Sequence, residues 1–297
     1  MKTGLVDSLT QWYRENAREL PWRGTAAAPW RVLVSEIMLQ QTPVVRVLPV
    51  FDSWMLRWPA PADLAASSTG DAVVMWGRLG YPRRALRLHA AAVACVERHA
   101  GEVPSGVGEL RALPGVGEYT AAAVAAFAFG QRVAVLDTNV RRVQARVLDG
   151  VAFASTSAPT LAERRRALHL LPADEKQAAE TSAAFMELGA LVCRARAPAC
   201  STCPVAPRCQ WLLGGRPEWT GPPRRGQTYA GTDRQCRGRL LAVVRDSAAP
   251  VPEQRLIDAW PDAAQRERAL SSLLHDGLIE RVTPRSSNGK PRFRLPR

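Results

Sequence analysis

The stretch Cys193-Arg-Ala-Arg-Ala-Pro-Ala-Cys200-Ser-Thr-Cys203-Pro-Val-Ala-Pro-Arg-Cys209 places four cysteines within seventeen residues. Four cysteines this close together indicate that their thiolates bind one shared group. Iron–sulfur clusters are bound by four cysteine thiolates. The 6-2-5 spacing favours a [4Fe-4S] cluster over structural zinc, whose ligands usually come in closely spaced pairs. Disulfides are a third possibility, but the N-terminal residues are not typical of a secretory signal, and reducing compartments disfavour disulfides.

The composition predicts a polyanionic partner. The 297 residues carry a net charge of +13, and lysine occurs only three times, so nearly all the positive charge is arginine. Arginine favours bidentate contacts with phosphate, and nucleic acid is the simplest partner; a merely solvated basic surface is the alternative. The most apolar run, residues 120–129, is too short to span a membrane. We therefore expect a monomeric, cytoplasmic, nucleoid-associated protein with no membrane partner.

Helical periodicity with frequent proline and glycine breaks runs from the N-terminus to about Trp211 and predicts an all-α fold. Residues 214–232 have the composition of a linker. Beyond it, helices are expected at 233–246, 252–260 and 262–276, then a strand at 278–282, a hairpin turn at 286–289 and a strand at 292–295. This tail is similar to a winged helix with a basic wing (Arg281, Arg285, Lys290, Arg292, Arg294), although a plain structural cap is the alternative.

The segment Leu113-Pro-Gly-Val-Gly117 precedes an Ala-rich helix. Its two glycines free the backbone to turn N–H groups outward at a helix N-terminus, which predicts a phosphate-binding loop; a simple tight turn is the alternative.

Two acidic residues lie in apolar surroundings. Glu36 is on a segment that is apolar on several faces, so its carboxyl group is expected to have a raised pKa; a salt-bridged structural glutamate is the alternative. Asp137 precedes a helix that contains two arginines, and an N-cap explains it as well as catalysis does.

Together these segments resemble the helix-hairpin-helix DNA glycosylases that carry an iron–sulfur cluster, the endonuclease III superfamily. The resemblance rests on residues 20–23, 35–42, 76–81, 113–117, 136–140 and 187–190 with the four cysteines. Within that family the chain is most similar to the A/G-specific adenine glycosylases. The implied fold has an iron–sulfur helical domain (1–25 and 136–213), a six-helix domain with the hairpin (26–135), the linker and a winged-helix-like domain (233–297).

The resemblance implies excision of adenine paired with 8-oxoguanine or guanine in double-stranded DNA. Glu36 would protonate the base, Asp137 would stabilise the sugar cation, and Tyr119 and Asn139 would support them. The resemblance also implies a base pocket (Trp22, Arg23, Leu39) and DNA contacts (Gly115, Val116, Gly117, Gln41, Thr42, Tyr81). Trp22 and Tyr81 could instead be core aromatics. Tyr119 stands where bifunctional members carry a lysine, so we expect a monofunctional enzyme without a Schiff base.

Two departures keep other functions open. Ala183 stands where the adenine glycosylases carry Gln or Glu in the base pocket, and the Nudix-like domain that reads 8-oxoguanine is replaced by the helical tail. A thymine-DNA mismatch glycosylase acting on G·T is therefore the main alternative, although thymine has no purine nitrogen for Glu36 to protonate. A non-catalytic DNA-binding protein is the third hypothesis, but it would not need both carboxylates.

Overall fold

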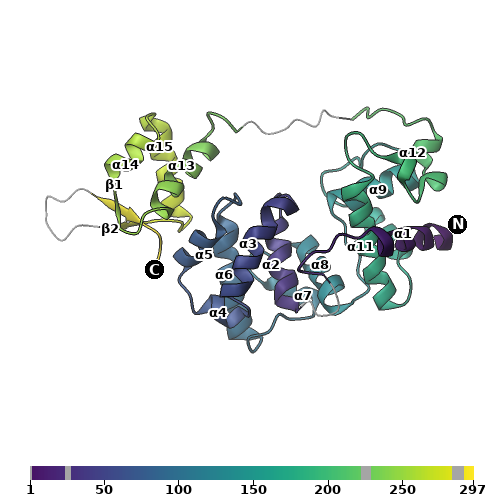
Figure 1. The fold of residues 1–297 in the computed structure, drawn as a ribbon, viewed down its shortest axis with the longest axis horizontal. Helices are drawn as coiled ribbons and strands as arrows, with labels where there is room; N and C mark the ends of the chain where they lie inside the picture. The colour runs from purple at the N-terminus through teal and green to yellow at the C-terminus, as the bar shows by residue number, and fades with distance from the viewer. Residues whose placement is uncertain (1, 24–27, 222–228, 283–290) are drawn as a thin grey trace. The chain divides into compact units, whose positions relative to one another are not determined.

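The computed structural model describes residues 2–23, 28–221, 229–282 and 291–297, and helices dominate it (Figure 1). The expected all-α class is confirmed. The chain forms two compact units. Unit 1 comprises Met1–Leu33, Ser105–Ala112 and Val116–Pro223, and unit 2 comprises Val34–Pro104, Leu113–Gly115 and Arg224–Arg297. The four-part division expected from the sequence stays a prediction. No helix within the described ranges is both long and apolar enough to cross a membrane.

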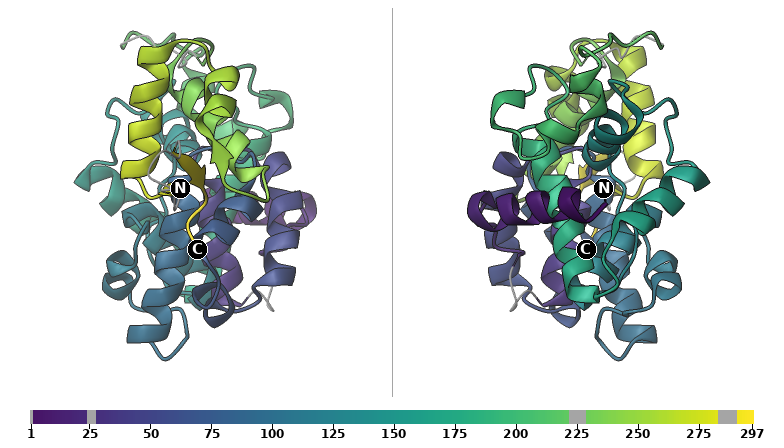
Figure 2. Two further views of the ribbon diagram at one scale, coloured as in Figure 1. Left: turned by 90° about the vertical axis from the view of Figure 1, so that its left-hand side faces the viewer. Right: turned by 90° about the vertical axis from the view of Figure 1, so that its right-hand side faces the viewer.

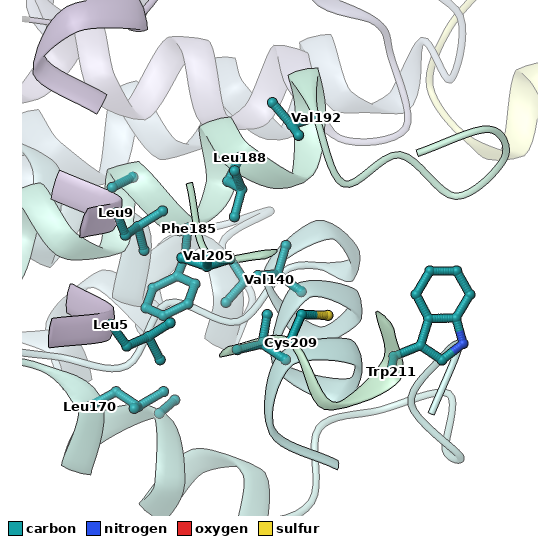
Figure 3. Close-up of a cluster of buried hydrophobic side chains, with 14 of the residues drawn as sticks. Leu5, Leu9, Val140, Leu170, Phe185, Leu188, Val192, Val205, Cys209 and Trp211 are labelled. Carbon is teal, nitrogen blue, oxygen red and sulfur yellow. The ribbon is translucent and has the colours of Figure 1, made fainter. Parts of the chain in front are cut away.

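Unit 1 is built around a core that joins the N-terminal helix to the cysteine-bearing segment. Its elements are α1 (Lys2–Asn16), α7 (Val107–Ala112), α8 (Glu118–Phe129), α9 (Thr138–Asp149), α10 (Leu161–Leu170), α11 (Glu175–Leu191), the short 3-10 turns η1 (Cys200–Thr202) and η2 (Ala206–Arg208), and α12 (Gln210–Leu213). Figure 2 shows α1 lying across α11. Leu5 and Leu9 of α1 share one apolar cluster with Phe185 and Leu188 of α11 (Figure 3). Figure 3 shows that Cys209 belongs to this same apolar cluster.

Local signals place the ends of the unit 1 helices. Gly130 and Gly150 end α8 and α9 in the left-handed conformation, which glycine adopts without a Cβ penalty. Thr160 and Glu163 form a reciprocal capping box at the start of α10. These boundaries follow from single residues and are therefore visible in the sequence.

Unit 2 has a core of tryptophans. Its elements are the second part of α2 (Pro29–Leu39), then α3 (Val44–Arg57), α4 (Pro61–Ala65), α5 (Thr69–Trp76), α6 (Arg83–Arg98), α13 (Asp233–Arg245), β1 (Val251–Pro252), α14 (Glu253–Ala259), α15 (Ala263–His275), β2 (Glu280–Val282) and β3 (Arg292–Arg294). The Trp54 ring packs edge-on against Trp58 and Trp76, with centroids 4.6 Å and 5.8 Å away. Edge-to-face pairs at these separations add to the free energy gained by burying the rings.

The tail, residues 233–297, has three helices and two strands where the sequence predicts them. The strand β1 was not predicted, because two residues are too few to show strand alternation. The strands lie in the order β1-β3-β2, all antiparallel, and Val251 pairs with the fully buried Phe293. The predicted hairpin turn at 286–289, with Arg285 and Lys290, lies outside the described residues.

Candidate active site and metal centre

The four cysteines of the 193–209 segment line one cavity, together with Leu188, Val192, Val205 and Trp211. None of the four is in a disulfide in the described chain. Across the described ranges, no group of three or more His, Cys, Asp or Glu side chains is arranged to hold a single metal ion. A set of four thiols around one shared space fits the donor chemistry of an iron–sulfur cluster.

A buried arginine reaches one of these cysteines. Arg146 is 2% exposed, and its Nη1 donates to Cys193 Sγ at 3.4 Å and to the Arg194 carbonyl oxygen at 2.8 Å. Its guanidinium lies 4.4 Å from the centroid of the Trp211 ring and 5.5 Å from that of Phe153. The cavity wall therefore carries a fixed positive charge beside a candidate thiolate ligand.

Asp137 is the N-cap of α9. Its Oδ1 accepts from the Val140 backbone N–H at 2.6 Å, and its Oδ2 accepts from Asn139 Nδ2 at 2.8 Å. Burial raises the pKa of Asp137, while these hydrogen bonds and the charge of Arg142 act in the opposite direction. The expected role of Asp137, stabilising a sugar cation, needs the ionised carboxylate, and the burial opposes that charge. The capping role is confirmed, and it does not exclude catalysis.

A chain of hydrogen bonds leads from Asp137 toward the cysteine segment. Arg142 donates to Asn139 Oδ1 at 2.8 Å, to the Gly189 carbonyl oxygen at 2.7 Å and to the Cys193 carbonyl oxygen at 2.8 Å. Gly189 is required for this approach, because a Cβ there would lie 2.7 Å from the Asn139 Cβ. Asn139 is therefore fixed on one side by Asp137 and on the other by Arg142.

The hairpin loop and α8 hold the other expected residues of this region. Gly115 has a φ of +81°, and a Cβ there would lie 2.8 Å from the Arg87 Cβ, so this position needs glycine. Gly117 is the N-cap of α8, and Val116 is 7% exposed. Tyr119, in the first turn of α8, is partly buried and packs against a small apolar cluster (Ala123, Ala126, Val135).

Arg23, expected in the base pocket, is held by an ion pair. Its Nη2 donates to Glu187 Oε2 at 2.8 Å, and Arg18 donates to both oxygens of the same carboxylate. The Glu187 side chain is fully buried, and the two arginines outweigh that burial and lower its pKa to about 2. The pairing of Arg23 with Glu187 was not predicted, because it joins residues 164 positions apart. Trp22, beside it in the chain, is 7% exposed.

In unit 2, Glu36 lies on α2 and is 6% exposed, next to the buried Ile37. Leu39 ends the helix, and the following Gln41 has a φ of +56°. Thr42 is buried. Tyr81 is 42% exposed with a φ of +47°, so it is not a core aromatic.

Arg84 connects these unit 2 residues, and the sequence analysis missed it. Its side chain donates to three carbonyl oxygens at the end of α2, to Thr42 Oγ1 at 2.8 Å and to the Gly80 carbonyl oxygen at 3.0 Å. The helical spacing of the buried residues on α6 could have identified Arg84. Positions 84, 88, 91 and 95 form the buried face of α6, and Arg84 is the charged member of that apolar row.

The tail contacts the same part of unit 2. Arg245 donates to the Gly77 carbonyl oxygen at 2.6 Å, and Arg234 donates to Tyr81 Oη at 3.3 Å. The candidate site residues thus fall into two groups, one in each unit. Unit 1 holds Trp22, Arg23, Val116, Gly117, Tyr119, Asp137, Asn139 and the four cysteines, and unit 2 holds Glu36, Leu39, Gln41, Thr42, Tyr81 and Gly115.

Comparison with known proteins assigns the family. Residues 34–163 match the HhH-GPD superfamily of base excision DNA repair proteins. The chain is 52% identical over 277 residues to an adenine DNA glycosylase of Mycobacterium tuberculosis, covering 93% of this chain and 90% of that protein. It is 35% identical over 207 residues to a thymine/uracil-DNA glycosylase of Pyrobaculum aerophilum, covering 69% and 89%.

The solved structure of a thermostable thymine-DNA glycosylase superposes with a TM-score of 0.65 at 26% identity, covering 72% of this chain and 97% of that one. That match supports the fold. The higher identity to the mycobacterial enzyme also extends over a longer part of the chain, and its 277 residues reach well into the tail. The chain belongs to the adenine DNA glycosylase family, within the HhH-GPD superfamily of base excision DNA repair proteins.

Proposed function

We propose that the protein is a monofunctional glycosylase that hydrolyses the N-glycosidic bond of adenine opposite 8-oxoguanine or guanine in double-stranded DNA. The observation that carries this proposal is the 52% identity to an adenine DNA glycosylase over nearly the whole chain. The basic charge of +13 suits a DNA substrate and an enzyme that works on chromosomal DNA.

The chemistry needs an acid and an anion. Adenine is a poor leaving group, and its departure leaves positive charge on the sugar. We assign Glu36 to protonate a ring nitrogen of the extruded base and then to help activate water, since it is a carboxyl group only 6% exposed to solvent. We assign Asp137 to stabilise the sugar cation, with Asn139 fixing the orientation of its carboxylate.

Tyr119 occupies the position at which a lysine would act as an amine nucleophile. A phenol forms no Schiff base, so the reaction ends with an abasic site and an intact strand. On the DNA side, the Gly115–Gly117 loop would bind a backbone phosphate through its N–H groups. Gln41, Thr42 and Tyr81 would enter the gap that the extruded adenine leaves.

The four cysteines would hold a [4Fe-4S] cluster, which when bound fixes the 193–209 segment. The cavity they share and the Arg146 hydrogen bond to Cys193 Sγ support this assignment. The arginines of this segment (Arg194, Arg196, Arg208) would then be held where they can meet DNA phosphates.

Strand-cleavage assays on duplexes with a single 8-oxoG·A, G·A, G·T or C·A pair test the proposal. Adenine release from the first two, with breaks that appear only after alkali, is expected. Thymine release from G·T would favour the alternative instead, and breaks without alkali would contradict the monofunctional assignment. Glu36→Gln should bind the 8-oxoG·A duplex normally and fail to excise.

A further inference from the structure

Arg84 is the most connected buried cation in the described part of unit 2. It is 5% exposed, and no carboxylate of the described chain forms a salt bridge with it. Its Nε is buried without a hydrogen-bond partner. A buried charge without a counter-ion costs stability unless hydrogen bonds compensate it, so the groups that accept from Arg84 indicate its role.

One side of the guanidinium binds the end of α2. Nη1 donates to the carbonyl oxygens of Ile37, Met38 and Gln40, at 3.0, 2.8 and 2.6 Å. These are among the last carbonyls of a helix, which have no partner within the helix itself. Arg84 therefore caps the helix that carries Glu36 at its C-terminal end.

The other side reaches the turn before α6. Nη2 donates to Thr42 Oγ1 at 2.8 Å and to the Gly80 carbonyl oxygen at 3.0 Å. The guanidinium also lies 5.6 Å from the centroid of the Tyr81 ring. One planar group thus binds two turns that are far apart in the sequence.

Both turns contain backbone strain. Gln41 and Tyr81 have φ values of +56° and +47°, a left-handed region that is unfavourable for a non-glycine residue. Each strained residue is adjacent to an Arg84 acceptor, Gln40 and Thr42 in one turn and Gly80 in the other. Strain of this kind persists where the surroundings fix it, and here Arg84 does so for both residues.

We propose that Arg84 is a positioning residue that holds the Gln41–Thr42 turn and the Tyr81 turn in one arrangement, in which both contact the base opposite the extruded adenine. The inference rests on the proposed function. Arg84 does not touch the substrate, and it acts through Gln41, Thr42 and Tyr81.

Arg84→Lys keeps the charge but loses the planar group that serves five acceptors. Single-turnover excision of adenine opposite 8-oxoguanine should fall by about 10- to 100-fold, as expected when positioning groups shift by about an ångström. Excision of adenine opposite an abasic site should fall much less, because no opposite base remains for the two turns to contact.

Leu64→Ala is the matched control, because this fully buried residue lies on α4, outside both turns, and its truncation lowers stability. At a temperature where the protein is folded, this variant should change adenine excision opposite 8-oxoguanine and opposite an abasic site by the same factor. A purely structural role predicts the same pattern for Arg84→Lys, and equal slowing of both duplexes by that variant would overturn the inference.

Arg84→Gln provides a second test if Arg84→Lys does not fold, because glutamine keeps a planar donor group but carries no charge and serves fewer acceptors. Excision opposite 8-oxoguanine should again fall much more than excision opposite an abasic site, and equal slowing of the two duplexes would reject the inference. If the unaltered enzyme releases no adenine at all, the proposed function fails instead.

Discussion

The two units fix their candidate site residues in different ways. In unit 1, arginines act together with buried carboxylates: Arg142 reaches Asp137 through Asn139, and Glu187 binds the partly exposed Arg18 and Arg23. In unit 2, Arg84 binds carbonyl and hydroxyl oxygens, with no carboxylate partner in the described chain. The difference implies that acid weakens the Glu187 contacts of unit 1 but not the Arg84 contacts of unit 2.

The largest expected effect separates the two roles of Asp137. Asparagine, serine and aspartate are comparable N-caps, so Asp137→Asn and Asp137→Ser should melt within a few degrees of the unaltered protein. Neither supplies an anion, so single-turnover excision should fall by about 10³-fold. Differential scanning calorimetry and quenched-flow assays measure the two quantities. Retained excision in either variant would leave Asp137 as a cap only.

The pH dependence of stability tests the carboxylates of unit 1. The pKa of Glu187 is about 2 in the fold against about 4.5 in the unfolded chain, so its contribution is complete above pH 4.5. It is lost as the pH falls from about 4.5 toward about 2, and amounts to about 3 kcal/mol. Urea unfolding over this range should show the loss, and Glu187→Gln should flatten the curve. The exposed Glu97→Gln is the control and should keep the slope.

The cysteine cavity gives a prediction of intermediate size. Arg146→Lys removes the planar donor beside Cys193, and hydrogen bonds to charged groups contribute about 1.5–3 kcal/mol. During mild oxidation, the iron content and the visible absorbance of Arg146→Lys should fall faster than those of the unaltered protein. The partly exposed Arg166→Lys, which pairs with Asp149, is the control. Equal rates of cluster loss in both variants would show that Arg146 does not protect the cluster.

The smallest expected effect concerns the tail. Arg245→Ala removes the hydrogen bond to the Gly77 carbonyl oxygen, at a cost of about 1 kcal/mol. Hydrogen exchange should increase locally at residues 77–81, while G·A and 8-oxoG·A excision change less than about threefold. An unchanged exchange rate in that segment would show that the contact is not maintained in solution.

The sequence predicted those features that depend on residues close together in the chain. The helices of the tail and the Asp137 cap followed from periodicity and from residue type, as did the glycine at position 115 with its positive φ. It was uninformative where partners lie far apart in the chain. The Glu187 pairing and the acceptors of Arg84 depend on tertiary approach, and β1 was too short to recognise.

Gly189 shows how narrow the tolerance is in unit 1. Asn139 lies against α11 at this glycine, and a Cβ added to Gly189 would be 2.7 Å from the Asn139 Cβ. Gly189→Ala leaves the polarity almost unchanged and by helix propensity alone should stabilise α11 by about 1 kcal/mol. The added methyl group of Gly189→Ala would nevertheless displace Asn139, and through Asn139 it would disturb the Asp137 carboxylate without contacting it.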